Sequence, residues 1–202
     1  MGNLFELIME TVIFVSVFVW FLFMNPPVQE SVQPYKPPMK AQSTKYQSSV
    51  STKTKLKSFI TKNNPKIDSK EADDIAYYID EYATKENVDP MLVAALISRE
   101  SSFQKKAVSK TGAKGLGQIK DFNFESLDIS DPFDVKQNVR GTVKYIKHLT
   151  SMWKDSVDQN RLVLASYYQG PNKTKKTKDN MASHVHRYVD DILARYKDLK
   201  NR

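Results

Sequence analysis

One glutamate, Glu100, ends a strongly apolar segment and is the residue best placed to do chemistry. The segment from Leu92 to Phe103 reads LVAALISRESSF. At the end of a buried helix, a carboxyl group is partly desolvated and faces the negative end of the helix dipole. Both effects disfavour the ionised form and should raise the pKa of Glu100. A protonated carboxyl group can donate a proton to the leaving oxygen of a glycoside, although a solvated last-turn glutamate remains the alternative.

A glycine-rich turn follows Glu100 and ends in a glutamine. Gly112, Gly115 and Gly117 fall within six residues, which indicates a tight turn where backbone can approach a ligand closely. Gln118 then offers both a donor and an acceptor, which suits sugar hydroxyl and N-acetyl groups. From these residues alone, an ordinary loop without a ligand stays open as an alternative.

The spacing of these residues resembles a family signature. The string E-S-x-F-x-x-x-A-x-S-x-x-G-A-x-G-L-x-Q is similar to that of the soluble lytic transglycosylases, relatives of goose-type lysozyme. Its ten fixed positions are met by Glu100, Ser101, Phe103, Ala107, Ser109, Gly112, Ala113, Gly115, Leu116 and Gln118. Further blocks of the family follow in the same order, and the resemblance covers about residues 70 to 197. They are Asp131-Pro132-Phe133-Asp134, Asn138-Val139, Tyr145-Ile146, Ala165 to Pro171 and Tyr188-Val189.

The chain departs from the family pattern at a few positions. Family members usually carry Met where this chain has Gly117, and Pro often stands where it has Lys120. An Ala-Gly pair is replaced by Gly141-Thr142. The Asn of the family's A-Y-N block is Tyr168, and that Asn is expected near the substrate.

The resemblance implies an enzyme of lysozyme-like, all-α fold that cleaves bacterial peptidoglycan. Glu100 would protonate the bond between N-acetylmuramic acid and N-acetylglucosamine, and would then act as base on the muramic acid 6-hydroxyl, which closes a 1,6-anhydro ring. No metal and no other cofactor is expected. Substrate-binding roles would fall to Ser101, Gln118, Tyr145, Tyr167 and Tyr168. The acids between residues 121 and 134 leave a second carboxylate open, with caps and solvated turns as the alternative.

Helical periodicity supports an all-α class independently of the resemblance. Residues 71–85 carry an apolar stripe with helical spacing, and Asp89-Pro90 has the form of an N-cap followed by Pro at the first helical position. Further helices are predicted over residues 134–153, 158–168 and 182–199. Loops and short helices are predicted between residues 102 and 132.

The N-terminal quarter predicts an anchor and a linker. Residues 1–24 are mostly apolar and lack Lys and Arg, which favours an uncleaved transmembrane helix over a signal peptide. Residues 25–55 are rich in Pro, Ser and Lys and predict a flexible linker. Residues 56–202 would form the catalytic domain, facing the cell wall. Sparse flanking charges leave the orientation open, including one in which the chain sits in a phage virion membrane.

The net charge limits the classes of binding partner but does not identify one. The net charge is +8, and residues 25–202 carry +10 because both acids of the first 24 residues lie outside them. Such a surface suits nucleic acid, anionic lipid or cell wall, but no nucleic-acid recognition motif is present. The basic segment with Lys173, Lys175, Lys176 and Lys178 is either a solvated loop or a contact for wall polyanions or peptide carboxylates.

Other functions stay open at this level. A hydrolytic muramidase on the same fold and a non-catalytic wall-binding module are the alternatives. The setting is also open, since small anchored enzymes of this kind open the wall for secretion or conjugation machines, for phage entry or for wall remodelling.

Overall fold

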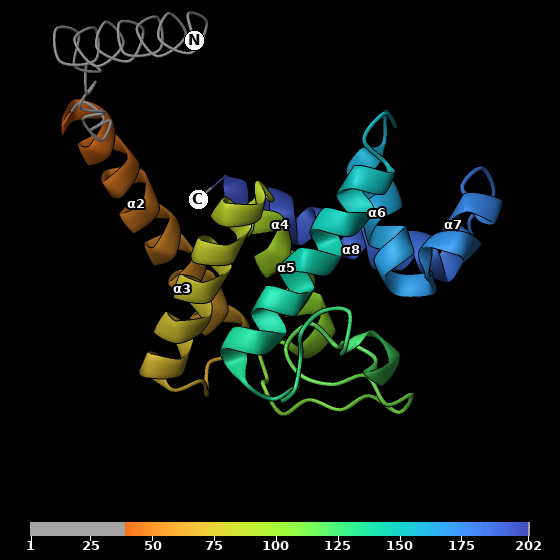
Figure 1. The fold of residues 1–202 in the computed structure, drawn as a ribbon, viewed down its shortest axis with the longest axis horizontal. Coiled ribbons are helices and arrows are strands. Elements are labelled where there is room, and N and C mark those ends of the chain that lie inside the picture. Colours follow the sequence, from red (N-terminus) through yellow and green to blue (C-terminus); the bar gives the residue numbers. More distant parts are fainter. Residues whose placement is uncertain (1–38, 202) are drawn as a thin grey trace, which may run out of the picture. The chain divides into compact units, whose positions relative to one another are not determined.

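The computed structural model describes residues 39–201 (Figure 1). The predicted membrane anchor, residues 1–24, lies outside them. The helices in chain order are α2 (Met39–Asn63), α3 (Ser69–Glu86), α4 (Pro90–Ser101), η1 (Asp121–Asn123), α5 (Val135–Met152), α6 (Gln159–Gln169), α7 (Pro171–Thr177) and α8 (Ser183–Lys200). Within the described residues, the only β-structure consists of isolated bridges from Lys114 to Val108 and to Ile119. The predicted all-α class is therefore confirmed.

The start of α2 differs from the predicted linker over residues 25–55. The described part of that segment, from Met39 on, is helical. Its prolines end at Pro38, so nothing in the sequence after that residue interrupts a helix until Pro65. Leu56, Phe59 and Ile60, at helical spacing, are buried in the core, and this packing stabilises the end of α2. None of the helices in residues 39–201 is both long and apolar enough to cross a membrane.

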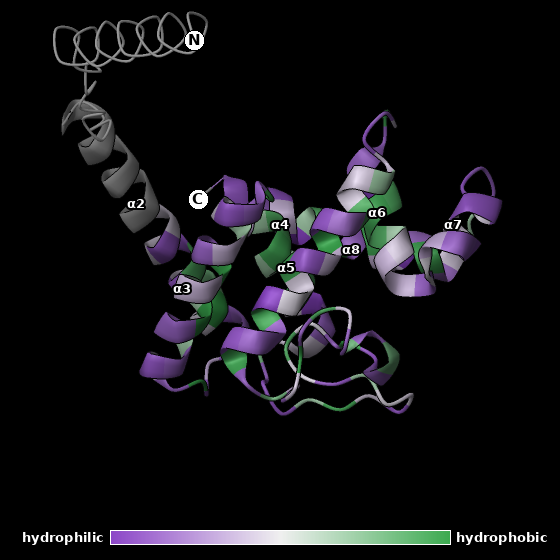
Figure 2. Ribbon diagram, in the orientation of Figure 1, coloured by the Kyte–Doolittle hydropathy of each residue, from purple (hydrophilic) through white to green (hydrophobic). Residues whose placement is uncertain are grey.

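α4 is the centre of the core. Every residue from Leu92 to Ser98 is buried, which is why this helix is apolar on all sides. It packs against α3, α5 and α8, while α5 packs against α3 and α6. Figure 2 shows the apolar α4 inside and hydrophilic residues on the outward surfaces of the other helices.

Carboxylate caps fix where the helices around the site begin. Asp89 accepts a hydrogen bond of 2.9 Å from the Met91 amide, with Pro90 at the first helical position, as the sequence predicts. Asp134 caps α5 in the same manner through the Gln137 amide at 2.8 Å. Each such cap stabilises its helix by about 1 kcal/mol. The caps therefore hold the start of α4, whose last turn carries Glu100, and the start of α5, whose inward face meets the glycine-rich loop.

Candidate active site

Glu100 lies in the last turn of α4, where its carboxyl group meets α8. The Tyr188 hydroxyl donates a hydrogen bond to Glu100 Oε1. Burial raises the pKa of Glu100 above its ordinary value, and the Tyr188 hydrogen bond and the Arg99 charge oppose that rise. Burial therefore outweighs both partners, in the direction that the sequence predicts. The protonated form of Glu100 is favoured more strongly than in a solvated glutamate.

Tyr188 is held in one orientation by its surroundings. It is only 4% exposed, and burial followed by the neighbouring Glu100 charge raises its pKa well above the usual range. Its hydroxyl therefore stays protonated and donates. The Arg99 guanidinium lies 5.5 Å from the Tyr188 ring centre, and Asp191 fixes Arg99 through an ion pair of 2.8 Å. Tyr188 belongs to the closing motif block, but the sequence did not identify it as a site residue.

The glycine-rich loop is fastened to α5 by Asn138. This side chain is 1% exposed. It accepts a hydrogen bond from the Gly117 amide at 2.8 Å and donates to the Pro132 carbonyl at 2.8 Å. A Cβ on Gly115 would lie 2.1 Å from that same carbonyl, and the φ of Gly115 is +75°. Both observations require glycine at this position, so the loop follows a single path beneath α5.

Tyr167, on α6, closes the loop from the other side. Its hydroxyl donates to the Gly117 carbonyl at 2.7 Å, and its ring lies 5.1 Å from the ring of Tyr145. Burial and then the Glu100 charge raise the pKa of Tyr167 well above the usual range. The hydroxyl therefore stays protonated and is electrostatically coupled to Glu100.

Gly117 and Thr142, two of the departures from the family pattern, lie against each other. A Cβ on Gly117 would be 2.0 Å from Thr142 Oγ1 and 3.1 Å from the Tyr167 hydroxyl. Thr142 is fully buried and donates its hydroxyl to the Asn138 carbonyl at 2.8 Å. Thr142 thus fills the space into which a side chain at residue 117 would have to project. The two departures therefore meet in one packing contact.

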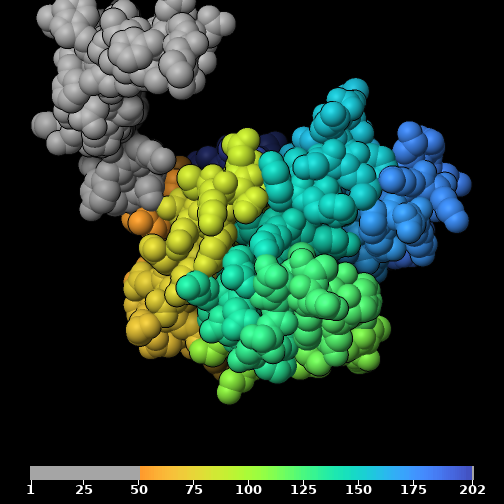
Figure 3. Space-filling model, viewed as in Figure 1, coloured from red at the N-terminus to blue at the C-terminus, as the bar shows by residue number. Residues whose placement is uncertain are grey.

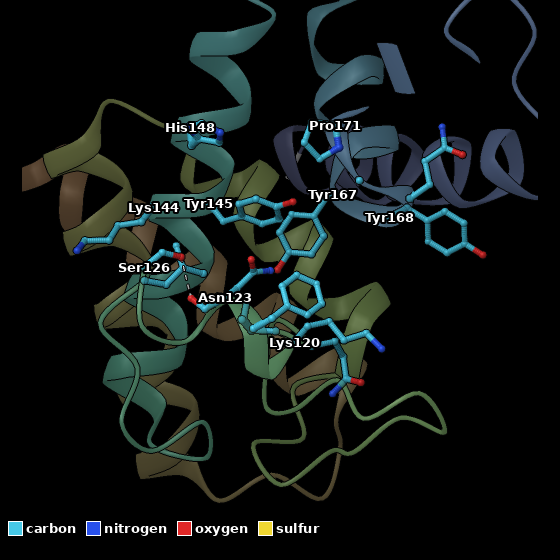
Figure 4. A pocket seen from close by; sticks show the side chains of 15 residues that line it. Lys120, Asn123, Ser126, Lys144, Tyr145, His148, Tyr167, Tyr168 and Pro171 are labelled. Atoms are coloured by element: carbon cyan, nitrogen blue, oxygen red, sulfur yellow. Dashed lines mark hydrogen bonds between the residues drawn. The ribbon is translucent and has the colours of Figure 1, made fainter. Parts of the chain in front are cut away.

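A cavity of about 710 Å³ opens between this loop and α5 and α6. Figure 3 shows the corresponding indentation between the loop residues and the residues of α6 and α7. Four of the five predicted substrate-binding residues line it, namely Gln118, Tyr145, Tyr167 and Tyr168. In Figure 4, Tyr145 and Tyr167 lie side by side in the middle of the cavity, with Tyr168 at one end. Glu100 is not among the lining residues and adjoins this region through Tyr167 and Tyr188.

The side chains of Ser101 and Gln118 donate their hydrogen bonds to backbone carbonyls of the protein itself. Ser101 is 7% exposed, its hydroxyl donates to the Ile97 carbonyl at 3.3 Å, and it does not line the cavity. The Gln118 amide donates to the carbonyls of Gly115, at 2.9 Å, and Ala107, at 3.1 Å. Gln118 therefore braces the loop even though it borders the cavity.

Tyr168 stands where the family pattern has Asn. Its ring stacks on Tyr188 with centres 4.5 Å apart and an angle of 29°, and His184 lies 5.9 Å away on the same helix, α8. Tyr168 remains 47% exposed. Tyr168, which lines the cavity, therefore covers one face of the Tyr188 ring, and the hydroxyl of Tyr188 donates to Glu100.

Three of the acids that follow the loop form interactions away from the cavity. Asp121 pairs with Lys114 at 2.9 Å and Asp128 pairs with Lys144. Asp131 accepts from the Phe133 amide at 2.8 Å, as an acid in a turn does. None of the described residues that line the cavity is an Asp or a Glu.

The architecture places the domain in the lysozyme-like class of all-α proteins. A solved structure of an inactive mutant of the lytic transglycosylase Slt from Pseudomonas aeruginosa is similar, with a TM-score of 0.56 at 16% identity. The likeness covers 62% of this chain and 24% of that one, and at this identity it concerns the fold.

The family follows from the sequence comparison. A family model described as the transglycosylase SLT domain matches residues 77–188, so the chain belongs to this family. Similar relatives are the membrane-bound lytic murein transglycosylases F of Pseudomonas syringae pv. syringae, 35% identical over 91 residues, and of Desulfosudis oleivorans, 37% identical over 95 residues. These matches cover 44% and 46% of this chain but only 18% and 21% of the relatives. The chain thus spans about a fifth of their length.

Proposed function

We propose that this chain is a peptidoglycan lytic transglycosylase with Glu100 as its acid and base. The observation that carries the proposal is a partly buried glutamate with a raised pKa, at the family's acid position, beside an aromatic-lined cavity. The relatives are named as lytic murein transglycosylases, and murein is peptidoglycan. Tyr145, Tyr167 and Tyr168 would contact the glycan strand, and Gln118 would shape the loop beneath it.

The proposed reaction uses one carboxyl group twice. Protonated Glu100 gives its proton to the glycosidic oxygen, and the bond from that oxygen to C1 of N-acetylmuramic acid breaks. The 6-hydroxyl of the same sugar then forms a bond to C1 while the Glu100 carboxylate takes the hydroxyl proton. Atoms balance without water, and Glu100 ends protonated. Tyr188 stabilises the transient carboxylate by donating to it, and the raised pKa restores the proton donor.

The products and one substitution test this proposal. Digestion of purified peptidoglycan should release muropeptides that end in 1,6-anhydro-N-acetylmuramic acid, as mass spectrometry can show. Products heavier by one water would identify a hydrolase on the same fold. Glu100→Gln should lower the rate by a factor of about 10³, in the range that general acids contribute. Cleavage by this variant at the rate of the unmodified chain would reject Glu100 as the acid.

We also propose that residues 1–24 anchor the enzyme in a membrane, with the domain facing the wall. The support is the apolar composition of that segment and the membrane-bound relatives. The domain would then open the wall locally, as secretion, conjugation or phage-entry machines require. Membrane fractionation of the intact chain against a chain lacking residues 1–24 tests the anchor, because both forms should be recovered together if it has no such role.

A further inference from the structure

A group of exposed lysines follows the cavity-lining residues Gly170 and Pro171 in the sequence. Residues 170–187 contain five Lys and Arg but a single acid, Asp179. Their net charge is therefore +4. We call the exposed side chains of Lys173, Lys175, Lys176 and Lys178, on and just after α7, the lysine surface.

The four lysines of the lysine surface have no ion-pair partners among the described residues, and they fall within six residues of the sequence. Elsewhere lysines lie against acids, as Lys57 does with Asp73 at 2.8 Å and Lys105 with Glu71 at 2.6 Å. Lys173 and Lys176 are three residues apart on one short helix, a spacing at which like charges destabilise the helix. The positive charges of these lysines therefore repel one another.

The domain holds α7 in place despite this repulsion. Thr174 is fully buried, and Gln169 donates to the hydroxyls of Thr174, at 3.2 Å, and Thr177, at 3.1 Å. The inward side of α7 is thus threonine, while its lysines face water. Figure 2 shows α7 as a largely hydrophilic helix at the edge of the domain beside α6 and α8.

The lysine surface begins two residues after the last residue that lines the cavity. Gly170 and Pro171, at the start of α7, line the cavity. Lys120, Lys144 and His148 also line it, with Lys144 and His148 on the α5 side in Figure 4. No acid is among the lining residues, so the wall of the cavity places no carboxylate against an anionic group of a bound ligand.

We propose that the lysine surface binds the carboxylates of the stem peptide carried by the glycan strand in the cavity. This inference rests on the proposed function, which puts such a strand there. Stem peptides leave the muramic acid residues sideways and end in free carboxylates, so they fit a cationic surface beside the groove. Lysines act as separate point charges on flexible stems, which suits a mobile peptide. A membrane surface fits less well, because α7 exposes no large apolar residue that could enter a lipid layer.

The inference predicts a substrate preference. The full 202-residue chain should cleave glycan strands with free-carboxylate stems with a kcat/KM about tenfold above that for the same strands with amidated stems, as two or three exposed ion pairs would produce. The difference should lie mainly in KM and should shrink as salt is added, because exposed charges are screened. Strands stripped of stems by an amidase should behave like the amidated ones.

Two matched variants test which lysines are responsible. K173Q/K175Q/K176Q/K178Q should lose the preference for free carboxylates and should cleave amidated and stripped strands as the unmodified chain does. K66Q/K85Q/K154Q/K197Q changes the net charge equally at four exposed lysines that form no ion pair with a described residue, and it should keep the preference.

Each contrary result is distinguishable. Cleavage of free and amidated strands at equal rates by the unmodified chain would overturn the inference and leave the proposed function intact. Equal losses in both variants would show a general charge effect and also overturn it, as would a loss on every substrate in the lysine variant. Binding of the chain only to walls that carry phosphodiester polymers would identify another ligand and would overturn the inference. No cleavage of any strand would reject the proposed function itself.

Discussion

The Glu100 carboxyl group and the lysine surface each lie next to residues that line the cavity, but their charges are placed in opposite environments. The Glu100 carboxyl group at the end of α4 is partly buried, and its hydrogen bond comes from a neutral hydroxyl. The lysines of α7 stand in water without an ion-pair partner among the described residues. A group that must gain and lose a proton benefits from a site where its two forms are close in free energy. A group that attracts a distant anion benefits from remaining ionised at every working pH.

The contrast predicts that only the buried region controls the pH profile, and Tyr188→Phe is the strongest test. Without the donated hydrogen bond, the pKa of Glu100 should rise, because that bond favours the carboxylate. The alkaline limb of the kcat/KM profile should therefore move to higher pH. The rate at neutral pH should fall by about tenfold or more, the cost of losing a hydrogen bond to a charged group. Stopped digestion assays across a pH series measure both.

Tyr196→Phe is the matched control for that variant. Tyr196 lies on the same helix and also donates to a carboxylate, Asp89, at 2.6 Å, but at the far end of α4 from Glu100. Its loss should leave the pH profile unchanged, and so should the loss of the α7 lysines. An alkaline limb that moves with Tyr196 or with the lysines, and not with Tyr188, would undo the contrast between the two regions.

The packing under the buried region gives the second test. Gly117→Ala should destabilise the domain by about 1–3 kcal/mol, because the added Cβ would overlap Thr142 Oγ1. In the double variant Gly117→Ala/Thr142→Ala this overlap is removed. The two substitutions together should therefore cost less than the sum of their separate effects. Urea unfolding of the four proteins provides the cycle, and strictly additive costs would show that residues 117 and 142 are not coupled.

These contacts mark where prediction from the sequence ends. Helical periodicity and the cap at Asp89 were predictable because they depend on neighbours within a few residues. The rise in the pKa of Glu100 followed from its apolar segment. The Tyr188 hydrogen bond was not predictable, since it joins residues 88 positions apart and depends on how α8 packs on α4. The same limit applies to Ser101, whose motif position does not reveal that its hydroxyl turns back to its own helix. The pairing of Gly117 with Thr142 likewise needed the structure.

Tyr168 lines the cavity and stacks on Tyr188, the partner of Glu100. Its substitution should have a smaller effect on activity. Tyr168→Phe keeps the ring stacked on Tyr188, so activity should stay within about twofold. Tyr168→Asn, the residue typical of the family, removes a stacked ring pair of about 0.5–1.5 kcal/mol. Activity should then fall by about two- to tenfold, with KM raised if the ring also contacts the sugar. Steady-state kinetics on soluble glycan fragments measures this, and equal losses in both variants would mean that the hydroxyl matters rather than the ring.

The smallest expected effect concerns the stability cost of burying Glu100. Because its folded pKa is raised above the ordinary value of 4.5, folding favours the protonated form. That contribution to stability is fully present below the unfolded pKa and is lost as pH rises through the folded pKa. Gln cannot ionise, so Glu100→Gln should match the unmodified chain at acid pH and become more stable than it, by about 1 kcal/mol or less, as pH rises above 4.5. Urea unfolding of both proteins across a pH series measures the gap. In a Tyr188→Phe background, where the pKa of Glu100 should be higher still, the gap should widen further. A gap that is constant with pH, or that closes as pH rises, would mean that the carboxyl group of Glu100 is not strained by its burial, and the contrast with the solvated lysines of α7 would lose its physical basis.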